Sequence, residues 1–168
     1  SVQFYVAYLI ASGGETSVTV TSTVSEKMTA ISMRITAASW HGTTPPEIST
    51  GATGLNAFPS PDTITASWGS ADNLFIVISC QDINGDVTFY PSTYPDNRTA
   101  TNGGTGGSTS SGEGGIATQD LAAASDSPGT FSISASEDWI AATMVVRPSA
   151  AGGGFSPPHN LMTLNVGR

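Results

Sequence analysis

Short runs of β-branched and aromatic residues recur along nearly the whole chain, and each run is bounded by Gly, Pro, Asn or Asp. Helical periodicity is hard to find. Many short strands separated by turn residues are typical of antiparallel sandwiches and barrels. The sequence therefore predicts an all-β fold, an antiparallel β-sandwich with long Gly- and Pro-rich loops and an extended C-terminal tail.

Three of these runs are apolar at both odd and even positions, which predicts central strands covered on both faces. They span residues 2–10, 73–80 and 139–147, and the second is the richest in β-branched side chains. Residues 17–24 and 27–37 alternate instead, which predicts strands with one wet face, and the odd positions of 27–37 should face the core.

Turn chemistry predicts how the remaining segments connect. Residues 40–61 carry paired prolines and should form a long ordered loop with a short strand near Ile48. Asn84-Gly85 predicts a type I′ hairpin that joins the 73–80 run to residues 87–90 and brings Cys80 close to Phe89.

Beyond that hairpin, residues 91–115 are rich in Gly, Ser, Thr and Asn, which predicts a mobile surface loop. Residues 116–124 fit either a short helix or a strand, and we favour the strand. Two further strands are expected at 130–135 and 139–147. We divide the chain into a sandwich domain (1–148), a Gly/Pro linker (149–158) and a strand-like tail (159–168).

The composition restricts the functional classes. The chain has 168 residues, a net charge of −8 and five basic residues that are not clustered, so it lacks the basic footprint of a nucleic-acid-binding protein. The 23 Ser and 22 Thr, with 11% charged residues, indicate a virion or extracellular setting. The apolar runs are less than half the ~20 residues that cross a bilayer, so we expect no membrane insertion.

No catalytic or metal-binding pattern is complete. Cys80 is the single cysteine, which excludes an intrachain disulfide and a cysteine-rich zinc site. Asp82-x-Asn84-x-Asp86 matches the start of a calcium loop, but Val87 and Thr93 stand where its Gly and Glu belong, so a hairpin turn is the better interpretation.

The remaining candidates for chemistry are equally incomplete. Glu137 and Asp138 are adjacent and point to opposite faces of a strand, so they cannot converge on one bond. His41 and His159 have no second ligand at metal spacing, and no Gly-x-Ser-x-Gly elbow is present. We therefore predict a protein that is not an enzyme and has no cofactor.

Two groups of residues suggest binding. Trp40, Trp68, Tyr90 and Tyr94 lie in or beside predicted loops and could stack on sugar rings, although roles as core or loop anchors are favoured. In the tail, Leu161, Met162, Leu164 and Val166 could form an assembly strand that pairs with a neighbouring copy. The equally weighted alternative is that this strand folds back on its own sandwich.

Five motifs together resemble a β-sandwich domain of tailed-phage and metagenomic virion or fibre proteins. The resemblance covers residues 4–148 and implies a non-enzymatic, jelly-roll-like module. The strands that precede residue 2 in the family pattern are absent here, which indicates a processed chain or a piece of a longer polypeptide. The motifs are Pro59-x-Pro61, Trp68-Gly69-x-Ala71-Asp72-Asn73-Leu74, Tyr90-Pro91-x-x-Tyr94, Pro128-Gly129-x-Phe131 and Trp139-Ile140-Ala141-Ala142-Thr143-Met144-Val145-Val146-Arg147-Pro148.

These observations lead to two functional hypotheses. The first is a structural subunit of a phage virion or surface assembly, such as a head decoration, fibre or tail component, that contacts copies of itself or other virion subunits. The second is a carbohydrate-binding adhesion module that recognises a host glycan. A glycan-cleaving enzyme would need two converging carboxylates, and no such pair can be named.

Overall fold

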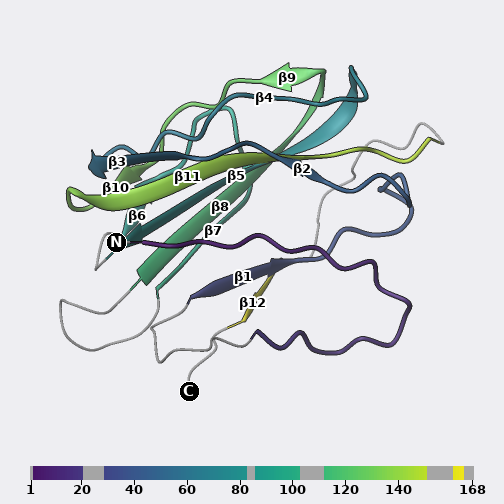
Figure 1. The fold of residues 1–168 in the computed structure, drawn as a ribbon, viewed down its shortest axis with the longest axis horizontal. Coiled ribbons are helices and arrows are strands. Elements are labelled where there is room, and N and C mark those ends of the chain that lie inside the picture. Colours follow the sequence, from purple (N-terminus) through teal and green to yellow (C-terminus); the bar gives the residue numbers. More distant parts are fainter. Residues whose placement is uncertain (1, 21–28, 83–85, 103–111, 151–160, 165–168) are drawn as a thin grey trace.

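A computed structural model describes residues 2–20, 29–82, 86–102, 112–150 and 161–164, the last as backbone only (Figure 1). All regular structure in these residues is β, and every strand pair is antiparallel. The predicted all-β, antiparallel class is therefore confirmed.

The strands differ greatly in length, and only β5, β8 and β11 reach ten residues. In chain order the described strands are β1 (Ala30–Met33), β2 (Glu47–Ile48), β3 (Ala52–Asn56), β4 (Ile64–Thr65), β5 (Ala71–Asp82), β6 (Val87–Phe89), β7 (Asp96–Asn102), β8 (Gly112–Ala123), β9 (Ser125–Asp126), β10 (Ser132–Ile133), β11 (Glu137–Val146) and β12 (Leu161–Leu164).

One large sheet forms the centre of the molecule. Its strands follow the order β2, β11, β5, β8, β7, and β3 pairs with β11 on the same side as β2. β2 and β3 therefore act as one interrupted edge strand, and β7 is the opposite edge. Three two-stranded pairs complete the fold: β4 with β9, β6 with β10, and β1 with β12.

The first face of the large sheet carries the main core. Phe75 and Val77 of β5 and Ala117 of β8 pack in one cluster with Ile64 of β4 and with Phe131, which precedes β10. The short pairs β4–β9 and β6–β10 thus supply the covering layer on this face. Burial of the Phe, Val and Ile side chains, each worth about 1.5–3 kcal/mol relative to exposure, is the main stabilising contribution.

The opposite face is covered by a smaller layer. Leu74, Ile76 and Val146 form a second cluster, against which Met33 and Trp40 from the region of β1 pack. Figure 1 shows β1 and β12 on the side of the large sheet opposite β4 and β9. The large sheet, with β5 and β11 among its inner strands, is thus covered on both faces, and the layers form an antiparallel β-sandwich.

Several sequence predictions are confirmed by these elements. The 73–80 and 139–147 runs are the central strands β5 and β11, and their apolar residues face both clusters because both sides of the sheet are covered. Residues 116–124 form a strand rather than a helix, as part of β8. The short strand near Ile48 is β2, and the strand within 27–37 is β1.

The prediction of a buried central strand at residues 2–10 is wrong. Residues 2–20 contain no strand, and among the described residues no backbone hydrogen bond joins them to another element. The predicted strand at 17–24 is likewise absent over its described part, residues 17–20. Residues 2–10 are apolar on both faces, but in the part of the chain that the structure describes no strand pairs with them.

Two connections also differ from the sequence prediction. β6 pairs with β10, so the expected hairpin between the 73–80 run and residues 87–90 is wrong, and Cys80 instead faces Ile140 and Gly114 on the neighbouring strands. Asn84 and Gly85 lie outside the described residues.

The predicted mobile loop at 91–115 contains the edge strand β7 and the beginning of β8. Polar and glycine residues can form these strands because β8 has partners on both sides, and its backbone pairing does not depend on side-chain hydrophobicity. Gly115 also leaves room for Val87, since a Cβ there would lie 2.9 Å from Cγ2 of Val87 and would force that side chain to shift.

Candidate interaction surface

The segment of residues 2–20, which we call the arm, exposes an unusual amount of apolar surface. Val2 and Phe4 are half-buried, and the large apolar residues that follow are 40–87% exposed. Single exposed apolar residues are normal on protein surfaces, but a contiguous set marks an interaction site. The exposed residues are Tyr5, Val6, Tyr8, Leu9, Ile10, Val18 and Val20.

The arm is divided by a turn that its sequence builds. Gly13 and Gly14 both have positive φ, at 96° and 100°, which glycine adopts without strain. The carboxylate of Glu15 accepts hydrogen bonds from the Ser12 hydroxyl at 2.7 Å and from the backbone N–H groups of Ser12 and Gly13, both at 2.9 Å. These bonds, led by the Ser12 hydroxyl, lower the pKa of Glu15 to about 2.

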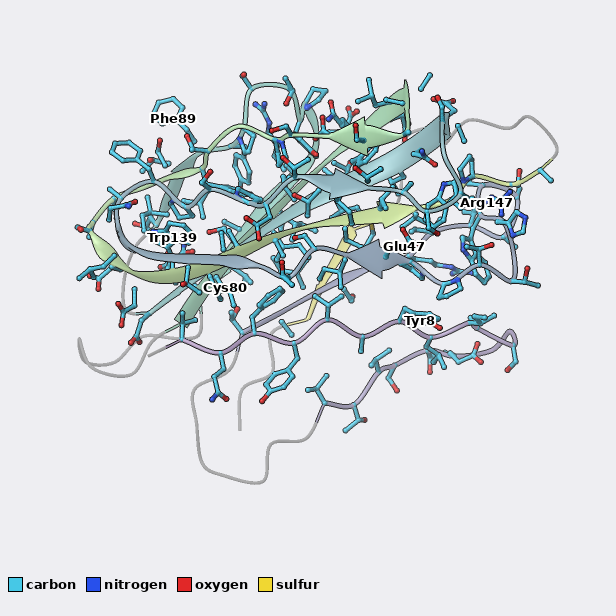
Figure 2. All side chains as sticks on the ribbon, turned by 45° about the horizontal axis from the view of Figure 1, so that its top comes forward. Tyr8, Glu47, Cys80, Phe89, Trp139 and Arg147 are labelled. Atoms are coloured by element: carbon cyan, nitrogen blue, oxygen red, sulfur yellow. The ribbon has the colours of Figure 1, made fainter. Side chains whose placement is uncertain are left out.

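The turn sets the course of the arm beside the body of the protein. Figure 1 shows the purple segment running along the lower side of the large sheet and then doubling back. Figure 2 labels Tyr8 on this segment, and its side chain is 59% exposed. The arm is therefore an extended appendage of the described fold.

The edge strand β3 is the second part of the candidate surface. Its five residues pair with β11 on one side, from Asn56 opposite Glu137 to Ala52 opposite Ala141. Within the described part of the chain no strand lies on its other side. Leu55 is 69% exposed on this strand. Gly54 packs directly against Trp139, where a Cβ would lie 2.5 Å from Cζ2 of the indole.

The opposite edge, β7, has a different character. Its ladder with β8 is irregular between Asp96 and Thr99, and Asn97 has a positive φ of 47°. Arg98 is bonded back to its own loop, from Nε to the Tyr94 carbonyl at 2.6 Å. Charges and irregular backbone at an edge are the features that discourage further strand pairing.

The tryptophans named as candidate ligand contacts anchor the fold. Trp40 packs against the second cluster and donates from Nε1 to the Thr44 carbonyl at 3.1 Å. Trp68 packs against the first cluster and donates from Nε1 to Oδ1 of Asn73 at 2.8 Å. Asn73 is fully buried and in turn donates to the Ala123 carbonyl at 2.7 Å. The Trp68 motif is thus a buried polar bridge between β5 and β8.

The two candidate tyrosines are also held internally. Tyr94 has no exposed surface and donates a short hydrogen bond to Asp126, and burial raises the pKa of its hydroxyl well above the usual range. Tyr90 meets Phe131 edge to face at 5.8 Å, with the guanidinium of Arg98 5.8 Å from its ring centroid. The structure does not bring the four aromatic residues together on one surface.

Instead, two phenylalanines lie on the outside of the covering layer. The backbone N–H groups of Phe131 and Ile133 donate to the carbonyls of Pro59 and Ala57, at 2.8 and 3.0 Å, and Ser132 lies opposite Phe89. Phe58, Ser132 and Phe89 therefore occupy neighbouring positions on three adjacent segments. Phe58 is 59% exposed and Phe89 is 70% exposed, and Figure 2 shows Phe89 at the rim of the molecule.

A row of three carboxylates crosses the second face of the large sheet near its end. Asp120 lies diagonally across from Asp72 on β5 and from Asp96 on β7. Burial raises the pKa of Asp120 to about 6, with further contributions from the charges of Asp72 and Asp96. Its Oδ1 atom is buried without a hydrogen-bond partner in the structure.

The residues considered for metal or catalytic roles are dispersed among the described ranges. His41 is bonded through Nδ1 to the Thr44 hydroxyl at 2.8 Å, and Glu137 and Asp138 begin β11. No group of three or more His, Cys, Asp or Glu residues with the geometry of a metal site occurs in the part of the chain that the structure describes. Asn84 and His159 lie outside it.

The predicted tail strand lies within its own chain in the structure. β12 pairs with β1 of its own chain, with Leu161 opposite Met33 and Leu164 opposite Ala30, which is the fold-back alternative. Met162 lies opposite Ser32, and Val166 lies outside the described residues. Over the described ranges there is no helix with the length and hydropathy to cross a membrane.

Comparison with known proteins returned no match to a family model, to a curated protein or to a solved structure. The candidate surface therefore depends on the geometry alone. Sequence reasoning identified the arm as apolar and strand-forming but placed it in the core, and it did not identify β3 or the outward pair Phe58 and Phe89. Alternation could have marked Phe58, because its neighbour Pro59 is buried while Phe58 itself points to solvent.

Proposed function

We propose that this protein is a non-enzymatic structural subunit of a phage virion or surface assembly, acting through protein–protein contacts. The observation that supports this proposal is the exposure of large apolar side chains along the arm. Residues 2–10 contain no charged residue, and five large apolar side chains between Tyr5 and Ile10 are 40–87% exposed. Exposure of this kind costs free energy in an isolated chain, and a partner that buries these side chains would recover about 25 cal/mol per Å².

The fold agrees with this role and with the jelly-roll-like topology that is part of the proposal. Successive strands move between the layers: β4 covers the large sheet, β5 belongs to it, β6 covers it, and β7 and β8 belong to it again. The virion or extracellular location that we propose follows from the five sequence motifs in residues 4–148 that resemble virion and fibre domains.

The test is the solution mass of the full chain and of a variant that lacks residues 1–20, measured by light scattering. We expect the full chain to be an oligomer and the shortened variant to be a folded monomer with the same β circular dichroism. Removing the arm should leave both core clusters intact, because neither contains an arm residue. A full chain that remains monomeric at tens of micromolar would overturn the proposal.

Carbohydrate binding is the second candidate, and the outward pair Phe58 and Phe89 favours it. Their rings flank Ser132 across two strand spacings, about 9.6 Å, which suits an extended neutral ligand. Apolar ring faces stack on sugars while nearby hydroxyl groups supply hydrogen bonds. Saturable binding on a glycan array that is lost in both Phe58→Ala and Phe89→Ala would move the assignment to an adhesion module.

A further inference from the structure

We propose that residues 2–10 of one copy add as a strand to the outer edge of β3 in a second copy of the chain. This inference rests on the proposed function and names the acceptor for the arm. Strand addition to an open sheet edge gives affinity through main-chain hydrogen bonds and specificity through alternate side chains.

The acceptor edge is open along its whole length. β3 pairs only with β11 among the described residues, so alternate backbone N–H and C=O groups of Ala52–Asn56 face away from the sheet. A row of unpaired backbone groups is a template for another strand. Thr53 and Leu55 on this strand are exposed, and so would lie beside an added strand.

Charge and regularity distinguish β3 from the other edge of the large sheet. β3 contains no charged residue and no proline, whereas β7 carries Asp96 and Arg98 and has an irregular ladder. An uncharged arm can lie against β3 without burying an ion, which would cost several kcal/mol. The unprotected edge is therefore the better acceptor.

The arm matches this edge in length and pattern. Pairing all five residues of β3 requires a strand of about 17 Å, and residues 2–10 provide nine residues in an extended segment. Val6, Tyr8 and Ile10 would share one face, and Tyr5 and Leu9 the other. One of these faces would contact Leu55, which is 69% exposed in the single chain.

The arm has no strand to pair with among the described residues of its own chain, and a second copy would supply one. Along its own body the arm makes no backbone hydrogen bond with any described residue, although it runs beside the sandwich (Figure 1). The donor and the acceptor are both present in every copy, so assembly needs no other protein.

Disulfide trapping between two variants that each carry one added cysteine tests the contact. One variant carries Tyr5→Cys, Val6→Cys, Ala7→Cys or Tyr8→Cys, and the other, distinguished by a mass tag, carries Leu55→Cys. Residues directly opposite on antiparallel strands lie ~4.5–5.5 Å apart at Cα, within the ~4.4–6.8 Å that a disulfide spans. Cys80 is common to all the variants, and burial raises the pKa of its thiol to about 12, which disfavours the reactive thiolate.

We expect mixed, oxidised samples to form a covalent dimer with one copy of each variant. Yield should alternate along the arm, high at residues 5 and 7 or at 6 and 8, because only one face of an added strand meets Leu55. Simple proximity would give no alternation. Ala100→Cys on β7 and Ser32→Cys on β1 are the matched controls, since each lies on another strand edge of the fold.

The outcomes separate this inference from the proposed function. Dimers trapped through Ala100→Cys or Ser32→Cys, but not through Leu55→Cys, would overturn β3 as the acceptor and leave the assembly role standing. An Ala7→Cys/Leu55→Cys double variant that closes only within one chain would overturn the second copy as partner. A full chain that is monomeric by light scattering would remove both proposals.

A pair of lysine variants gives an independent measurement. Thr53→Lys and Leu55→Lys place a charge at exposed positions on the acceptor edge, and we expect each to weaken association at least tenfold without changing the monomer fold. Ala100→Lys places the same charge on β7 and should leave the association constant within twofold. Equal effects from all three variants would contradict the inference.

Discussion

Buried polar side chains at single positions decide how the layers connect. Asn73 accepts from Trp68 and donates to Ala123, and Thr143 donates from its hydroxyl to the Asp62 carbonyl at 2.6 Å. Each satisfies groups that would cost about 1–3 kcal/mol if they were buried without a partner. The Trp68 and Asn73 motif that suggested a family resemblance thus has a direct physical role in holding a loop against the central strand.

At Gly54 we predict a stability change that isolates one close contact. Gly54→Ala places a Cβ 2.5 Å from the Trp139 ring, which is 5% exposed and cannot move without disturbing β11. We expect a loss of about 1–3 kcal/mol in the free energy of unfolding. Urea titration, with tryptophan emission as the probe, measures this loss.

Gly112→Ala is the control for this prediction. Its Cβ would meet only the Gln81 carbonyl at 3.8 Å, which is an ordinary van der Waals contact. A Gly54→Ala protein as stable as the Gly112→Ala protein, with unchanged emission, would show that the indole has room to move.

The carboxylate row predicts a pH dependence of stability. The folded pKa of Asp120 is about 6 and its reference value is 3.8. The stabilisation associated with protonated Asp120 is fully present below pH 3.8 and is lost as the pH rises through 6. Asn at position 120 does not ionise, so Asp120→Asn avoids this loss. The free energy of unfolding of the variant should therefore exceed that of the wild type by an amount that grows across this interval.

We expect the advantage of Asp120→Asn to level off near neutral pH at about 1 kcal/mol. A shift of two pKa units corresponds to ~3 kcal/mol, which solvent screening of this partly exposed site reduces. Thermal unfolding from pH 3.5 to 7.5 measures the difference. Asp86→Asn, which removes one negative charge outside the row, is the control, and an equal advantage there would assign the effect to net charge.

At the scale of elements, the strands that could be predicted from local sequence are those whose two faces are both covered by other layers. The runs around Phe75 and Val145 are largely apolar on both faces, so only a central strand can bury them. β3 was missed because Ala-Thr-Gly-Leu-Asn has neither alternation nor β-branched density, and its pairing with β11 is decided by tertiary contact. β7 and the start of β8 were missed for the same reason, since glycine and threonine there pair through the backbone.

The pairing of β12 with β1 gives a prediction about one layer. Deleting residues 151–168 removes the only strand that pairs with β1 among the described residues. We expect faster amide exchange at Ala30–Met33 and a loss of about 1–2 kcal/mol, with β5 and β11 still protected. Exchange mass spectrometry measures both regions in one experiment.

The solution mass is the second readout for the same deletion. Because β12 pairs within its own chain, the number of copies in the assembly should not change. Dissociation on deletion of residues 151–168 would instead identify the tail as an assembly strand.

At the scale of the whole molecule, the candidate site was only half predictable. Residues 2–10 were predicted as a central strand and form none, because an apolar run does not by itself specify a strand to pair with. The four aromatics named first are held internally: Trp40, Trp68 and Tyr94 each pack against a core cluster and donate a hydrogen bond, and Tyr90 packs against Phe131. Phe58 and Phe89 are exposed instead. Burial depends on which strands pair, and β6 with β10 joins segments more than forty residues apart.

The arm and the β3 edge are different surfaces of one chain, and this difference restricts the symmetry of any assembly built from them. Two copies can exchange arms reciprocally and close as a twofold dimer. Without such exchange, each copy gives its arm to the next, and the contact is heterologous. Repetition of a heterologous contact produces a ring when the rotation between neighbours closes, and a filament when it does not.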